Sequence, residues 1–137
     1  MDLLIDTNVV LDLLLMREPL FAQATRVFEL IAEKKAKGYL TVNQTTDIFY
    51  LLRRHGKSST EANAFVQKLL AQMVALDSTL VDAKLALDSG MSDYEDALLT
   101  HTALRADLDY ILASDLKDFK DSPVAAIGYD EFKQLSS

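Results

Sequence analysis

The chain has 137 residues, half of them hydrophobic, and its 14 lysine and arginine residues against 21 aspartate and glutamate residues give a net charge of −7. This length suits one core, so we expect residues 1–137 to form one domain, and the acidic balance argues against a protein that holds nucleic acid through an overall positive field. The absence of cysteine excludes disulfide scaffolds, zinc knuckles and cysteine nucleophiles, and with no membrane-spanning apolar run it predicts a cytoplasmic protein without a membrane partner.

Short apolar runs of strand length recur along the chain, with longer helical stretches between them. The predicted strands are Leu3–Ile5, Tyr39–Val42, Met73–Leu76, Tyr110–Ala113 and Val124–Ile127. Strands that are separated by helices need crossover connections, which favours a mostly parallel sheet covered by helices on both faces. The alternation therefore predicts the α/β class.

The helical stretches are marked by apolar spacing and by capping residues. The predicted helices begin at Thr7 and Asn8, cover Pro19–Lys35, cover Asn43–His55, start again at about Ser58, cover Ser78–Asp88, and run from a Ser92 and Glu95 capping box to about Ala106. No internal repeat or linker interrupts this pattern.

Carboxylates follow several of the predicted strands. Asp6 comes directly after the first strand, and its neighbours Thr7 and Asn8 add a hydroxyl, an amide and free backbone N–H groups. Asp47 lies in the first turns of the helix after the second strand, and Asp115 follows the fourth strand. Ligands of parallel sheets bind beyond the carboxyl ends of the strands, so these acids are candidates for a site as well as for simple helix caps.

A further contribution comes from the helix before the fourth strand. Asp93 and Asp96 are three residues apart, so we expect them to share one helical face, on which Thr100 also lies. Acids in a first turn also complement the helix dipole, and this simpler interpretation remains open for Asp93. Asp96 is followed by core-type residues and is the stronger site candidate.

Several carboxylates at one sheet edge repel one another unless a cation joins them. Oxygen ligands without cysteine or a histidine cluster select Mg²⁺ or Mn²⁺ over Zn²⁺. Such an ion activates water and stabilises the leaving oxygen of a phosphodiester. The pattern therefore favours a metal-dependent phosphodiesterase site.

Three stretches of the sequence resemble one family. Leu3–Asn8, Asp93–Leu98 and Asp115–Phe119 are similar, in order and spacing, to the motifs of PIN-domain ribonucleases, and most of all to the small VapC toxins. The resemblance covers essentially the whole chain. It implies a three-layer α/β/α sandwich with a five-stranded parallel sheet, a Mg²⁺ or Mn²⁺ site, and endonucleolytic cleavage of RNA.

Carried over residue by residue, the resemblance makes Asp6 the first metal ligand and Asp96 the ligand on the helix. Asn8 would form a hydrogen bond within the site and help orient Asp6. Asp47 stands where the family usually has glutamate, which shortens its reach by one methylene group. These roles are expectations from the resemblance.

The fourth acid is less well defined, because Ala113-Ser114-Asp115 departs from the sequences that relatives have after this strand. We favour Asp115, the acid nearer the strand end, and keep Asp118 as the second candidate. Lys117 lies between them and is a candidate for offsetting phosphate charge.

The resemblance also implies partners: an RNA substrate, a cognate antitoxin protein and a second copy of the chain in a homodimer. The alternative is a PIN-like interaction module that binds protein or RNA with little or no cleavage, which the departures at Asp47 and at residues 113–115 favour. A phospho-accepting receiver domain with Asp77 as acceptor lacks the lysine that such domains have after the fifth strand. A dehalogenase-like phosphatase would need aspartate where Asn8 stands.

Overall fold

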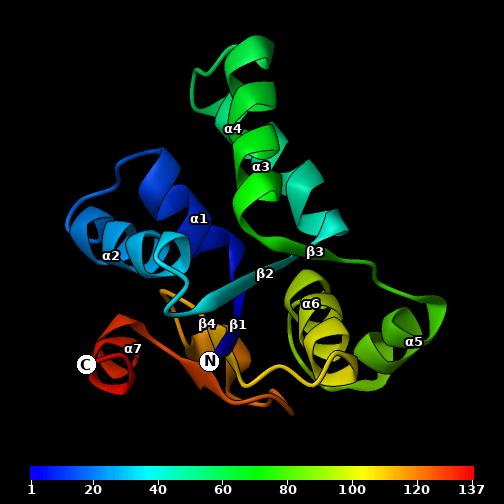
Figure 1. Ribbon diagram of the computed structural model, residues 1–137. Helices are drawn as coiled ribbons and strands as arrows, with labels where there is room; N and C mark the ends of the chain where they lie inside the picture. The colour runs from blue at the N-terminus through cyan, green and yellow to red at the C-terminus, as the bar shows by residue number, and fades with distance from the viewer.

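The computed structural model describes residues 1–137 as a five-stranded sheet with helices on both faces (Figure 1). All four strand pairings are parallel, and the strand order is β3-β2-β1-β4-β5. The predicted three-layer α/β/α sandwich is therefore confirmed.

The five strands lie where the apolar runs predicted them, with small differences at their ends. They are β1 (Asp2–Ile5), β2 (Lys37–Thr41), β3 (Val74–Leu76), β4 (Tyr110–Leu112) and β5 (Ala126–Ile127). The fifth is shorter than predicted because the Ser122 hydroxyl engages both backbone groups of Val124: it donates to the carbonyl at 2.6 Å and accepts from the N–H at 3.1 Å. Val42 belongs to a helix, since Thr41 caps the helix that begins there.

Seven α-helices and one short 3₁₀-helix connect or follow the strands. They are α1 (Thr7–Leu14), α2 (Phe21–Ala32), α3 (Val42–Arg54), α4 (Ser59–Gln72), α5 (Leu80–Asp88), α6 (Tyr94–Arg105), the 3₁₀-helix η1 (Lys117–Phe119) and α7 (Tyr129–Leu135). The last of these was not expected from the sequence. None of the helices is long and apolar enough to cross a bilayer.

Two helix ends differ from their predictions. The cap of α6 is Asp93, whose Oδ1 accepts a hydrogen bond from the backbone N–H of Asp96 at 2.9 Å, so the predicted Ser92 and Glu95 capping box is wrong. Asp93 has extended backbone angles and lies just outside the helix rather than on its face. Helix α2 ends before Lys35 because Lys34 takes a left-handed conformation with φ of 60°.

Side chains that alternate along β1 enter two cores. Leu3 and Ile5 pack in the larger core with residues of α1 to α4 and α7, while Leu4 packs in the smaller core with residues of α6. All three are 0% exposed, and burial of each such side chain contributes about 1.5–3 kcal/mol. This alternation fixes the register of β1 and so the direction of whatever follows it.

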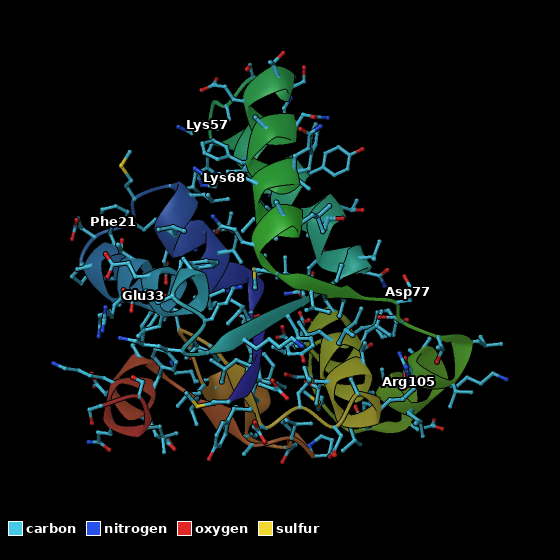
Figure 2. The ribbon with its side chains drawn as sticks, in the orientation of Figure 1. Phe21, Glu33, Lys57, Lys68, Asp77 and Arg105 are labelled. Carbon is cyan, nitrogen blue, oxygen red and sulfur yellow. The ribbon has the colours of Figure 1, made fainter.

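Helix α5 is held against α6 by an ion pair between a buried carboxylate and a partly exposed guanidinium. Arg105 Nε donates to both carboxylate oxygens of Asp82, at 3.1 and 3.0 Å, and its Nη2 donates to the carbonyl oxygen of Asp77 at 2.6 Å (Figure 2). Burial raises the pKa of Asp82, but hydrogen bonds from Thr79 and Arg105 outweigh that effect and hold the pKa below its usual value. The pair fixes which face of α5 points to solvent.

Strand β1 lies in the middle of the sheet and marks the point where the strand order reverses. The chain passes from β1 to β2 and β3 on one side, and later forms β4 and β5 on the other side. At such a point the loops after the two neighbouring strands diverge and leave a crevice at their carboxyl ends. Residues directly after β1 and β4 are therefore placed to form a site.

Candidate functional site

Asp6 is fixed at the carboxyl ends of both central strands. Its backbone N–H donates to the carbonyl of Leu112 at the end of β4, at 2.9 Å, and its side chain caps α1 by accepting from the N–H of Asn8 at 3.4 Å. The side chain is 5% exposed. Burial raises the pKa of Asp6 to about 6, the negative charges of Asp118 and Asp12 add to the rise, and hydrogen bonds from the Asn8 and Thr7 backbone oppose it.

Asp96, in the first turn of α6, faces Asp6 across the crevice. Burial raises the pKa of Asp96 to about 7, and the charge of Asp6 is the next largest cause, followed by those of Asp93 and Asp118. The charge of Asp6 thus opposes ionisation of Asp96, a residue far from it in the sequence, which requires the two carboxylates to be close. The structure brings together the two acids that the sequence marked most strongly.

Glu95 and Asp47 form a second part of the site. Burial raises the pKa of Glu95 to about 7, and both the charge of Asp47 and a hydrogen bond with its carboxyl group add to the rise. Asp47 is half-buried on α3. The sequence analysis assigned Glu95 to a helix cap and did not include it in the site; its position beside Asp96 was the available signal.

The two candidates after β4 occupy different places. Asp115 is exposed, and its Oδ1 accepts from the backbone N–H of Lys117 at 3.0 Å in a tight turn. Asp118, in η1, is the acid of this loop whose charge raises the pKa of both Asp6 and Asp96. Both acids are exposed, and the effect of the Asp118 charge on the pKa of Asp6 and Asp96 favours Asp118, the second candidate, while Lys117 is exposed beside it.

Asn8 contacts Asp6 through its backbone rather than its side chain. The Asn8 N–H is the group that donates to Asp6, whereas the Asn8 side-chain oxygen accepts from Arg17 Nη2 at 3.3 Å. The orienting contact that was expected from the amide is thus supplied by the main chain. The amide itself links the site to Arg17.

A buried glutamine joins α3 to the end of β1. The side-chain nitrogen of Gln44 donates to the carbonyl of Ile5 at 2.8 Å and to the hydroxyl of Thr7 at 3.3 Å, and its side-chain oxygen accepts from the N–H of Thr41 at 2.8 Å. Gln44 is 1% exposed. This contact holds the start of α3 beside Asp6 and brings Asp47, one turn further on, over the crevice.

We call the carboxylates that act on one another here the acidic cluster. Its members are Asp6, Asp47, Asp93, Glu95, Asp96 and Asp118. An oxygen-only donor set whose members raise one another's pKa fits a hard divalent cation, because the cation would offset their repulsion. The donor chemistry therefore fits the ion. The carboxylates are near enough to affect one another's pKa, but no three acids or histidines of the chain are close enough to enclose an ion.

The family model of the PIN domain matches residues 2–117 of this sequence. No curated protein matches the chain in sequence. The family match spans β1, α6 and the turn after β4, and it therefore includes every member of the acidic cluster except Asp118.

Solved structures of toxin–antitoxin proteins are similar in fold. VapBC2 from Rickettsia felis, bound to promoter DNA, has a TM-score of 0.70 at 12% identity, over 93% of this chain and 98% of that chain. A toxin–antitoxin complex from Klebsiella pneumoniae gives 0.68 at 16%, over 92% and 96%. VapC20 from Mycobacterium tuberculosis, described as a toxin that cleaves the sarcin–ricin loop, gives 0.68 at 16%, over 84% and 91%.

Proposed function

Because this chain belongs to the PIN domain family, as its sequence motifs suggested, we propose that it is an endoribonuclease that depends on Mg²⁺ or Mn²⁺ and acts as the toxin of a toxin–antitoxin pair. The observation that carries the proposal is the position of Asp96 beside Asp6: burial raises the pKa of Asp6 to about 6, and burial together with the charge of Asp6 raises the pKa of Asp96 to about 7. Carboxyl groups whose pKa values are raised by burial and by a neighbouring charge are typical of functional sites.

Asp6, Asp96 and Asp118 are the residues that would hold the ion, with Asp47 reaching in from α3. A divalent ion bound there supplies a Lewis acid that activates water and offsets the charge of the phosphodiester. Glu95 has a pKa near neutrality, so its carboxyl group is suited to exchanging a proton with the reacting water. Burial of Asp6 keeps competing solvent away from one side of the site.

The first prediction concerns the two opposed acids. Asp6→Asn and Asp96→Asn should each lower the rate of RNA cleavage in Mn²⁺ by at least about 100-fold, because even residues that only support a metal ligand contribute about 10- to 100-fold. Cleavage of a labelled RNA by purified protein measures the effect. Asp130→Asn is the matched control, since Asp130 is an exposed acid of α7 without an ion-pair partner, and it should cleave like the natural chain.

The second candidate function is an interaction module with little or no cleavage. It is favoured by the spacing of the carboxylates, no three of which enclose an ion, and by the shorter side chain of Asp47. The same assay separates the two functions. If the natural chain binds Mn²⁺ but cleaves no faster than Asp6→Asn, the ribonuclease proposal is wrong and the interaction module is favoured.

We propose the remaining partners from the resemblance. An antitoxin protein would bind this chain, as antitoxins bind the toxins in the similar complexes. A second copy would form a homodimer through the exposed apolar side of α5. A cytoplasmic location stays a prediction from the lack of cysteine.

A further inference from the structure

Arg17 is a cation that is connected to the acidic cluster through Asn8. It lies in the turn after α1, and its Nη2 donates to the backbone carbonyl of Asn8 at 3.1 Å and to the Asn8 side-chain oxygen at 3.3 Å. The N–H of the same asparagine donates to the Asp6 carboxylate at 3.4 Å. Only one residue therefore separates the guanidinium from Asp6.

The other side of the Arg17 guanidinium is anchored in the protein interior. Its Nε is buried and lies 3.1 Å from Oδ1 of Asp12, whose side chain is 3% exposed. The second oxygen of Asp12 accepts from the Tyr129 hydroxyl at 2.7 Å. Burial and the charge of Asp12 raise the pKa of Tyr129, so the phenol keeps its proton and remains a donor.

Two nitrogens of Arg17 form no hydrogen bond within the chain. Nη2 donates to Asn8 and the buried Nε forms only an ion pair with Asp12, while Nη1 has no hydrogen bond, and the side chain is 38% exposed. Burying a carboxylate is costly, and an arginine in an exposed turn has no need of it for stability. The buried Asp12, which accepts from Tyr129, instead anchors Nε of a side chain that stays partly exposed beside Asn8.

We propose that Arg17 binds a backbone phosphate of the RNA beside the linkage that is cut, and that Asp12 and Tyr129 are positioning residues that aim it. This inference rests on the proposed function. A rigid guanidinium suits phosphate oxygens better than a flexible ammonium does, and a phosphate contact fixes the strand without reading its sequence. Within a strongly acidic crevice it also supplies attraction where the carboxylates repel the RNA.

RNA binding by the full chain carrying Asp96→Asn, measured by fluorescence anisotropy with a labelled single-stranded RNA of mixed sequence, tests the inference without cleavage. Adding Arg17→Gln should weaken binding about 10- to 100-fold, because hydrogen bonds between charged groups are strong. The slope of log affinity against log salt should fall by about 1, as for the loss of one phosphate contact. Arg26→Gln on α2, an exposed arginine paired with Glu29, is the control and should change neither value.

Two further variants separate charge from orientation. Arg17→Lys keeps the charge and should restore the salt slope with only part of the affinity. Tyr129→Phe leaves the Arg17 charge in place, so it should weaken binding with an unchanged salt slope. In the chain with Asp96 intact, Arg17→Gln should raise KM more than it lowers kcat, which a merely structural role would not do.

The inference is overturned if Arg17→Gln and Tyr129→Phe bind RNA with natural affinity and salt slope, even if their melting temperatures fall. If Arg17→Gln does not fold, Arg17→Lys and Tyr129→Phe decide by the same two measurements. Failure of the proposed function has a different signature, since the chain without substitutions would then cleave no RNA.

Discussion

At the scale of residues, the acidic cluster opposes folding while no cation is bound. Asp6, Glu95 and Asp96 have pKa values of about 6, 7 and 7, all above the ordinary values of these side chains. A carboxyl group whose pKa is higher in the folded chain favours folding when it is protonated. That contribution is complete below the pKa of the unfolded chain and is lost as the pH rises through the folded pKa.

We therefore predict that the free energy of unfolding falls as the pH rises from about 4 to about 7 in the presence of EDTA. The fall should amount to about 1–2 kcal/mol, because solvent screens the partly exposed Glu95 and Asp96. Urea denaturation across this range measures it. Asp82 and Glu61, whose pKa values are lowered, act in the opposite direction, because their contribution to stability grows as the pH rises. That contribution is complete above the ordinary carboxyl pKa of about 4, so only the lowest part of this window is affected.

Two comparisons complete this test. Asp96→Asn should flatten the dependence on pH, and Mn²⁺ at neutral pH should restore stability that EDTA removes. Stability that is flat or that rises over this range in EDTA would show that the acids of the cluster do not repel one another as their burial and spacing imply.

At the scale of elements, α5 shows how one buried contact determines an exposed surface. Asp82 turns inward to Arg105, which leaves the opposite side of α5 facing solvent. Leu80 and Leu87 on that side are each 71% exposed. The helical period places Lys84 between them and Asp88 nearby, so an antiparallel copy would bring each lysine close to an aspartate of its partner.

We predict that Leu80→Glu combined with Leu87→Glu converts a dimer into a monomer, because like charges would replace an apolar contact. Sedimentation equilibrium of the natural chain and the double variant measures the change. Leu135→Glu on α7, where a leucine is 47% exposed, is the control and should leave the dimer intact. A natural chain that is monomeric at high concentration, or a double variant that still dimerises, would contradict the assignment of this surface.

At the scale of the whole molecule, an apolar groove is lined by residues of α1, α2 and α4, among them Phe21 and Lys68, which Figure 2 labels. The groove has a volume of about 510 Å³, and Phe21, Phe28 and Phe65 contribute to its lining. Lys57 and Lys68 line the same groove, and Lys57 Nζ lies 6.0 Å from the centre of the Phe65 ring. An amphipathic antitoxin segment with acidic residues along its edge fits this combination.

We predict that Lys57→Glu combined with Lys68→Glu weakens antitoxin binding about tenfold and makes it less sensitive to salt, because both changes remove attraction to acidic side chains. Titration calorimetry with the proposed cognate antitoxin measures the affinity. Lys133→Glu on α7 is the control for net charge. RNA cleavage should be unchanged in the double variant, and an unaltered antitoxin affinity would exclude this groove.

Local sequence patterns were enough to predict the α/β class, the order of the five strands along the chain, and Asp6 and Asp96 as candidate site residues. These follow from local patterns, since apolar runs separated by helices form parallel strands and Asp6 stands directly at a strand end. Asp96 was accessible in the same way, because it lies in the first turn of a helix. Glu95 lies beside Asp96 in the sequence, but it was interpreted as a capping residue and so was not placed in the site.

Which other side chains lie near Asp6 and Asp96 became clear only from the tertiary structure. Asp115 and Asp118 are both exposed, but Asp115 closes a turn with the Lys117 backbone, whereas the charge of Asp118 acts on Asp6. Tyr129 reaches Asp12 from a helix at the other end of the chain. Such contacts depend on how crossover connections stack distant segments and on the direction of each side chain, and neither is encoded in the spacing of residues along the chain.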